Sequence, residues 1–175
     1  MRVVYRRARD ADDRNFAAIT WRASFRRSPY GGLTQMSRWV ESTDADIALI
    51  LAKPRVNIMI AADPDAKGRD ADLFGHIVWE APRQTGALID LGTPPLIYFL
   101  YVKHDYRGNG FARGLMRAAG IDAVKPYNFV CRTHAADSLR DAGKMPRARW
   151  RPLLGRVTEG ARDEHARDEA ADPAA

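Results

Sequence analysis

The sequence predicts a single α/β (α+β) domain in which helices flank a mixed, mostly antiparallel central sheet. Two Val- and Ile-rich runs, 56–62 and 73–80, are joined by a short polar loop, which is typical of an antiparallel strand pair. Residues 97–121 change from the period of a strand to the period of a helix across a glycine-containing turn. A short apolar run at 127–133 follows that helix, and this order favours a parallel, right-handed crossover.

The amino-terminal residues predict a strand and then a helix. Residues 3–7 alternate weakly between apolar and polar side chains, as a strand does. Residues 10–13 supply capping side chains and acidic first-turn residues for a helix. Apolar residues at helical spacing then continue to about Arg26.

A second helix is predicted after the breaker at 28–32. Thr34 can cap this helix, and the helix ends before Pro54, because a proline disfavours helical backbone at the residue before it. The polar residues 42–44 predict an interruption in the middle of this helix.

One glycine and one long loop mark the middle of the chain. Gly75 lies inside a predicted strand, where a glycine weakens the strand unless another segment comes close or a bulge is required. Residues 82–95 are irregular and rich in glycine and proline. A loop of this length often belongs to a binding site, although a plain hairpin connection is the ordinary alternative.

The carboxy-terminal part predicts a helix, a last strand and a tail. Residues 134–142 form a short helix that ends at Gly143, and residues 150–157 form a strand whose proline favours a sheet edge. Residues 158–175 lack an apolar stripe and predict an acidic, disordered tail. The predicted domain therefore spans residues 1–157.

Composition narrows the class of protein. The chain has 175 residues, 46% of them hydrophobic, which suits one buried domain, and no apolar run is long enough to span a membrane. The single Cys131 cannot form an internal disulfide and predicts a cytoplasmic protein. No metal is predicted, because no zinc-ligand spacing links the four histidines, 76, 104, 134 and 165.

The formal charge of +6 conceals an asymmetry between the body and the tail. Residues 158–175 contain six acids and two arginines and carry −4, which leaves +10 on residues 1–157. Such a body attracts polyanions, whether a coenzyme phosphate, an acidic protein or a nucleic acid. A solvated, arginine-rich surface explains the same charge, so charge alone selects no function.

The turn between the central strand and its helix has the properties of an anion site. A helix that begins directly after a strand points unpaired N–H groups and partial positive charge away from the sheet end. Gly108 and Gly110 let a ligand approach the main chain, and Arg107 and Arg113 add positive charge. An ordinary strand-to-helix turn is the alternative, because a short Gly-x-Gly is a weak signal.

The familiar phosphate loops fit this turn poorly. A P-loop needs Gly-Lys-Ser/Thr at the helix start, and a dinucleotide loop needs a third small residue and a later acid. The segment Arg107-Gly108-Asn109-Gly110-Phe111-Ala112 instead resembles the Arg/Gln-x-x-Gly-x-Gly/Ala signature of the GNAT superfamily of acetyl-CoA-dependent N-acyltransferases. Residues 100–106 resemble the strand that leads into that family's loop, and residues 73–79 resemble its third strand.

The resemblance implies a GNAT-like fold with a βα phosphate-binding loop at its centre. It also implies an enzyme that transfers an acetyl group from acetyl-CoA to a primary amine by direct attack on the thioester. In the family, the loop amides hold the pyrophosphate of coenzyme A and the preceding strand hydrogen-bonds the pantetheine arm. On this chain, the resemblance implies a coenzyme site made of Leu100, Tyr101, Val102, Arg107, Gly108, Asn109, Gly110, Phe111 and Ala112.

One departure from the family concerns the end of the sheet. The family usually closes with an antiparallel pair of strands, and little room for two strands remains after Gly143. The edge is therefore either truncated or completed by another subunit, which leaves a homodimer open.

Acetyl transfer needs a base for the amine and a proton for the departing thiolate. The family's usual acid is a Tyr on a late helix, and Leu139 occupies that position here. Glu80, at the end of the strand beside the central one, is the predicted base. Tyr98 and Tyr101 are expected on opposite faces of the central strand, so one of them can reach the site between the splayed strands. Tyr98 is the catalytic candidate of the two, and the general acid stays unassigned. Weaker candidates are Asp90, His104, Cys131 and Ser138.

Each of the two catalytic candidates also has a purely structural interpretation: Glu80 as a solvated carboxylate at a strand end, and Tyr98 as a half-buried strand tyrosine.

Two other functions also stay open for the chain. A non-catalytic acyl-CoA-binding relative would explain the missing Tyr and the short carboxy-terminal end. A basic nucleic-acid-binding module would explain the charge, but an aromatic RNA-binding signature and an arginine-rich recognition helix are both missing. The sequence leaves the acceptor as an amine-bearing small molecule or protein.

Overall fold

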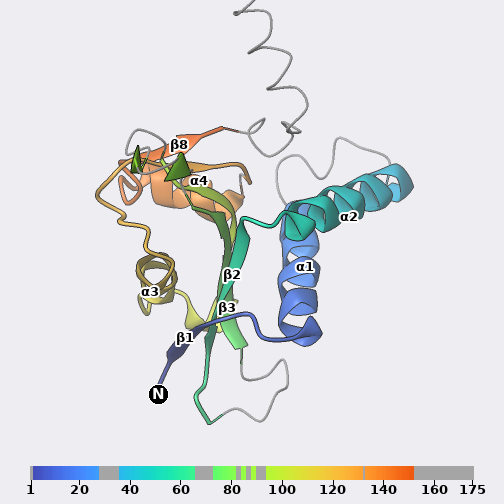
Figure 1. The fold of residues 1–175 in the computed structure, drawn as a ribbon, viewed down its shortest axis with the longest axis horizontal. Coiled ribbons are helices and arrows are strands. Elements are labelled where there is room, and N and C mark those ends of the chain that lie inside the picture. Colours follow the sequence, from blue (N-terminus) through green and yellow to red (C-terminus); the bar gives the residue numbers. More distant parts are fainter. Residues whose placement is uncertain are drawn as a thin grey trace, which may run out of the picture.

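A mixed sheet with the strand order β1-β2-β3-β6-β7-β8 forms the centre of the fold (Figure 1). The computed structural model describes residues 2–27, 36–65, 73–81, 84–85, 88–89, 94–131 and 133–151. Neighbouring strands from β1 to β6 are antiparallel, whereas β6, β7 and β8 run parallel. The predicted mixed, mostly antiparallel sheet is confirmed. Its strands are β1 (Val4–Arg7), β2 (Val56–Ala62), β3 (Leu73–Glu80), β6 (Leu96–Val102), β7 (Tyr127–Phe129) and β8 (Ala148–Trp150).

Helices cover both faces of the sheet, as Figure 1 shows. Helices α1 (Ala11–Arg26) and α2 (Met36–Ala52) lie on one face, where Phe16, Trp21 and Ile47 enter a buried cluster. Helix α3 (Phe111–Ala118) lies on the opposite face and buries Phe111 and Leu115 in a second cluster. The sheet therefore separates two apolar cores, as alternating strand side chains require. Helix α4 (His134–Asp141) follows β7.

The observed helix α2 differs from the prediction in one respect. Its backbone is helical without interruption through residues 42–44, where the sequence predicted a break. Tertiary contacts explain the difference: Ile47 packs into the core shared with α1, and Asp44 forms an ion pair of 2.8 Å with Arg22 of α1. Polar residues that favour a break locally are thus held in the helix by α1. The breaker at 28–32 and Thr34 lie outside the described residues.

The carboxy-terminal strands differ from their predicted bounds. Strand β7 ends at Phe129 rather than at residue 133, and the last strand, predicted at 150–157, is β8 at Ala148–Trp150. The backbone N–H of Arg151 donates to the carbonyl of Phe129 at 2.9 Å, so β8 pairs parallel with β7. Residues 152–157 and the predicted tail lie outside the described residues, so the domain boundary stays a prediction.

The loop at 82–95 contains a short hairpin. Strands β4 (Gln84–Thr85) and β5 (Leu88–Ile89) pair antiparallel, which agrees with the hairpin connection given above as the ordinary alternative for this loop. Helix α4 ends as predicted, because Gly143 follows it with a φ of 67°, the left-handed backbone that glycine adopts without strain.

His76, on β3, is fully buried between the sheet and α1. Its ring lies 5.4 Å from that of Phe16, 5.5 Å from that of Phe99 and 5.7 Å from that of Tyr101, measured between centroids. Neither ring nitrogen has a hydrogen-bond partner among the described residues. Burial lowers the pKa of His76 to about 3, so the folded protein holds this imidazole neutral.

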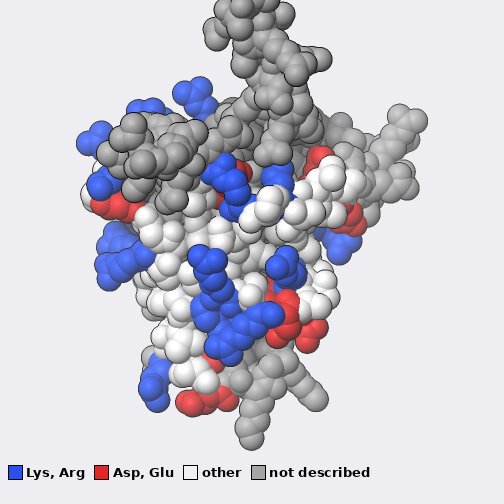
Figure 2. All heavy atoms as spheres, in the orientation of Figure 1, with Lys and Arg blue, Asp and Glu red and all other residues white. Residues whose placement is uncertain are grey.

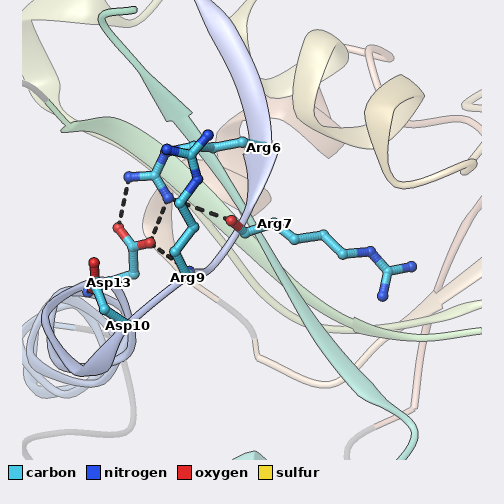
Figure 3. A network of polar contacts seen from close by, with 5 residues as sticks. All are labelled: Arg6, Arg7, Arg9, Asp10 and Asp13. Atoms are coloured by element: carbon cyan, nitrogen blue, oxygen red, sulfur yellow. Dashed lines mark hydrogen bonds and ion pairs between the residues drawn. The ribbon is translucent and has the colours of Figure 1, made fainter.

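A polar network joins the start of α1 to β1 (Figure 3). As predicted, Asp10 caps α1, and its side chain accepts from the backbone N–H of Asp13 at 2.9 Å. The Asp13 carboxylate is buried and accepts from the Arg6 guanidinium and from the backbone N–H of Arg9. Burial raises the pKa of Asp13, but these hydrogen bonds lower it by more, so the pKa lies below its ordinary 3.8.

Replacing Asp13 by Asn should destabilise the protein by about 2 kcal/mol, because Arg6 would lose a charge-assisted partner. Urea unfolding at pH 7 measures this loss. Asp12→Asn, an exposed position on the same helix turn, is the control and should change stability little. Because the pKa of Asp13 is lowered by folding, the stability it contributes is present above pH 3.8 and is lost as pH falls below that value. Equal midpoints for the two variants would contradict this account of the network.

Basic side chains are distributed in separate groups over the face shown in Figure 2, one of them beside acidic side chains near β1 and the start of α1. None of the helices in the described ranges is both long and apolar enough to cross a membrane.

Candidate active site

The turn that leads into α3 has the geometry of an anion site. Gly108 and Gly110 have φ values of 82° and 80°, and a Cβ built on either would face open space. The first helical hydrogen bond runs from the N–H of Gly114 to the carbonyl of Gly110, at 2.9 Å. The amides of residues 111–113 therefore have no acceptor within the helix and carry its partial positive charge. The glycines are needed here because other L-residues are strained at positive φ.

Side chains tie this loop to the end of β6. The Arg107 Nε donates to the carbonyl of Val102 at 3.1 Å, and the rest of its side chain is exposed. A short 3₁₀ helix, His104–Tyr106, connects β6 to the loop. The rings of Tyr106 and Phe111 pack against Phe74 of β3, at 4.6 Å and 5.5 Å between centroids. Residues 107–112, predicted as the coenzyme loop, thus form the turn before α3 and its first two residues, anchored to β6 and β3.

Strands β6 and β7 pair only where β6 begins. Leu96 and Ile97 are matched with Asn128 and Phe129, and the last ladder bond runs from the N–H of Val130 to the carbonyl of Ile97, at 3.1 Å. Strand β6 continues to Val102, so its residues 98–102 have no β7 partner in the part of the chain that the structure describes. Leu100, Tyr101 and Val102, the predicted pantetheine contacts, lie in this stretch.

A β-bulge interrupts β6 at Tyr98. Val78 is matched with Phe99 and Trp79 with Ile97, so Tyr98 is the additional residue. Tyr98 and Tyr101 consequently pack against the same core, on the α1 and α2 face. The predicted placement of these two tyrosines on opposite faces is wrong, because the bulge shifts the alternation of side chains by one residue.

The bulge brings the two predicted catalytic residues together. The Tyr98 hydroxyl, in a side chain that is 1% exposed, donates to Glu80 Oε2 at 2.8 Å. Lys53 Nζ lies 3.5 Å from the Tyr98 hydroxyl, and an Arg55 guanidinium nitrogen lies 3.5 Å from Glu80 Oε1. We call Lys53, Arg55, Glu80 and Tyr98 the strand-end cluster.

Sequence reasoning missed the two cations of the strand-end cluster. They flank Pro54, the proline that predicted the end of α2, and the next residue, Val56, is matched with Glu80 in the sheet. The antiparallel pairing of the two predicted strands was the available signal, because it places residues before β2 next to residues at the end of β3.

The weaker candidates lie elsewhere or are unsuited to catalysis. Burial raises the pKa of Cys131 to about 12, although a hydrogen bond with Trp21 opposes the shift, so little thiolate is present. The side chain of His104 is 87% exposed and faces Asp105. Leu139 and Ser138 are exposed on α4, and Asp90 lies outside the described residues. Within the described ranges, no group of three or more His, Cys, Asp or Glu side chains is placed to hold a metal ion.

Comparison with known proteins adds structural neighbours. No protein-family model and no curated protein sequence matches the chain. The chain is similar to a GNAT-family acetyltransferase from Desulfovibrio desulfuricans, with 15% identity and a TM-score of 0.40 over 67% of this chain and 63% of that one. It is similar to the PaiA N-acetyltransferase of Thermoplasma acidophilum, solved with coenzyme A, with 15% identity and a TM-score of 0.41 over 69% and 70% of the two chains.

A third neighbour is the ribosomal-protein-alanine N-acetyltransferase of Brucella melitensis, with 16% identity and a TM-score of 0.42 over 99% of this chain and 93% of that one. The match spans less than two thirds of the length of the Desulfovibrio chain. These three solved structures are described as acetyltransferases, and the Desulfovibrio protein is assigned to the GNAT family.

Proposed function

We propose that the protein is an N-acetyltransferase that transfers an acetyl group from acetyl-CoA to a primary amine. One observation carries the proposal: the anion site and the strand-end cluster lie at opposite ends of the part of β6 that is unpaired with β7. Tyr98 and Val102 are four residues apart, about 13 Å at the rise of a strand. Such a stretch suits an extended arm with a diphosphate at one end and a reactive group at the other.

The proposal assigns groups of this chain to two parts of coenzyme A, the diphosphate and the pantetheine arm. In this proposal the amides of residues 111–113 and the Arg107 guanidinium hold the diphosphate. Main-chain N–H and C=O groups of residues 100–102 bind the two amides of the pantetheine arm, as an added strand would. A cytoplasmic location, where acetyl-CoA is available, belongs to the same proposal.

The hydrogen bond between Tyr98 and Glu80 can keep protons balanced during transfer. Acetyl-CoA supplies the thioester, and the C–N bond to the amine forms as the C–S bond breaks. Glu80 accepts the proton that the attacking amine loses. Tyr98 donates its hydroxyl proton to the leaving sulfur and recovers a proton from Glu80 across the 2.8 Å hydrogen bond.

Gly110→Glu should raise the Kd for coenzyme A by about 100-fold or more, because a carboxylate would occupy the anion site. Calorimetric titration with coenzyme A measures this change. Gly120→Glu is the matched control: Gly120 has a φ of 74° and open space around its Cβ position, but it follows the other end of α3. Both variants introduce the same charge and a similar backbone strain, so only the first should lose binding. Equal affinities would contradict the coenzyme site.

Glu80→Gln and Tyr98→Phe should each lower kcat by about 100-fold while the Kd for coenzyme A stays unchanged. Release of free thiol from acetyl-CoA in the presence of a pool of amines measures the rate. Coenzyme binding without any thiol release would favour the non-catalytic acyl-CoA-binding alternative, which the exposed Leu139 at the usual acid position motivates.

A further inference from the structure

We propose that the acceptor is a small amino acid, whose amine and acidic group lie within a few bonds of each other. The inference rests on the proposed function and names the acceptor class of the same site. It is carried by the two cations that adjoin the Glu80–Tyr98 pair.

The four side chains of the strand-end cluster form a continuous line of polar groups. Lys53 Nζ lies 3.5 Å from the Tyr98 hydroxyl, which donates to Glu80 Oε2 at 2.8 Å. Glu80 Oε1 lies 3.5 Å from the Arg55 guanidinium, which also donates to the carbonyl of Ala81 at 2.9 Å. Of these four residues, Lys53 and Arg55 are cations and Glu80 is a carboxylate.

The guanidinium of Arg55 discriminates between classes of amine. A polyamine or another polycation would bring positive charge next to Arg55 and offer it no anionic group to bind. An amino acid instead offers a carboxylate, which the planar guanidinium of Arg55 can bind with two parallel hydrogen bonds. Nearby positive charge also favours the neutral form of the acceptor amine, and only that form attacks a thioester.

The short distances limit how far apart the amine and the acid can be. Glu80 would face the amine and Arg55 the acid, and their side chains lie 3.5 Å apart. Both side chains are partly exposed, at 22% for Glu80 and 36% for Arg55, so an acceptor reaches them from solvent. A protein amino terminus has a peptide carbonyl in place of the neighbouring carboxylate and lacks the charge that Arg55 would bind.

Matched pairs of acceptors test the inference. The common amino acids, each as the free acid and as its carboxamide, are assayed for thiol release from acetyl-CoA, with cadaverine as a dication. The free acid of the best pair should have a kcat/KM at least about 10-fold above that of its amide. Arg55→Gln should bring the ratio close to one by raising KM for the acid, whereas Arg117→Gln, an equal loss of charge at the far end of α3, should preserve it. Equal use of acid and amide, or a preference for cadaverine, would overturn the inference.

A binding experiment separates failure of this inference from failure of the proposed function. N-Acetyl amino acids and N-acetyl amino acid amides are titrated calorimetrically into the protein saturated with coenzyme A. Tighter binding of the acids that is lost in Arg55→Gln would support the proposed acceptor class. If no amine were acetylated in the same preparation, that second result would count against the proposed enzymatic activity alone. Equal binding of acids and amides would overturn the acceptor class even if acetyl transfer were observed.

Discussion

The protein should lose about 5 kcal/mol of stability between pH 6.5 and pH 3 through His76 alone. Burial lowers the pKa of His76 from 6.5 to about 3, and each unit corresponds to about 1.4 kcal/mol. The unfolded chain binds a proton on this residue below pH 6.5, whereas the folded protein binds it only near pH 3. The stability that depends on a neutral His76 is therefore fully present above pH 6.5 and is lost as the pH falls towards 3.

His76→Leu should abolish most of this acid sensitivity, because leucine has a similar volume and nothing to protonate. At pH 7 the variant should be at least as stable as the parent, since an apolar side chain replaces two ring nitrogens without hydrogen-bond partners among the described residues. Chemical denaturation at pH 7, 6, 5 and 4 measures the difference. His104→Leu, at an exposed position, serves as the control and should retain the acid loss. If stability fell with pH in parallel for the parent and His76→Leu, the buried imidazole would not be the cause of the acid sensitivity.

Gly75→Ala should destabilise the protein by about 3 kcal/mol or more. A Cβ at this position would collide with the carbonyl oxygen of Tyr101 and crowd the Cα of Val102. These atoms belong to the backbone of β6, so relief requires β3 and β6 to move apart at the centre of the sheet. The affinity for coenzyme A should also fall, because Arg107 is anchored to the carbonyl of Val102 at 3.1 Å.

Gly114→Ala is the matched comparison for this effect. The atoms nearest to its Cβ would belong to the ring end of Tyr5, a side chain that is 37% exposed and can swing away. Alanine also favours helix over glycine by up to about 1 kcal/mol, which offsets the adjustment. Urea midpoints for the two variants should therefore differ clearly. Similar midpoints would contradict the distinction between a backbone obstacle and a movable side chain.

Local sequence was sufficient for most elements and for the geometry of the turn before α3. The change of period after β6 and the glycines at 108 and 110 predicted a strand, a turn with positive φ and a helix, and the structure has all three. Gly75 was interpreted as a place of close approach or of a bulge, and the carbonyl of Tyr101 lies close to it. These features depend on backbone preferences and side-chain period, which neighbouring residues in the chain determine.

Tertiary structure alone decided the composition of the strand-end cluster and the face on which Tyr98 lies. The bulge in β6 is a property of two paired strands, and α2 stays unbroken because Arg22 and Ile47 hold it against α1 and the sheet. Tyr98 contacts Glu80 across 18 positions and Lys53 across 45. Local patterns place a residue on a strand or a helix, but strand register and helix docking are settled by packing between distant segments, and these determine which charges become neighbours.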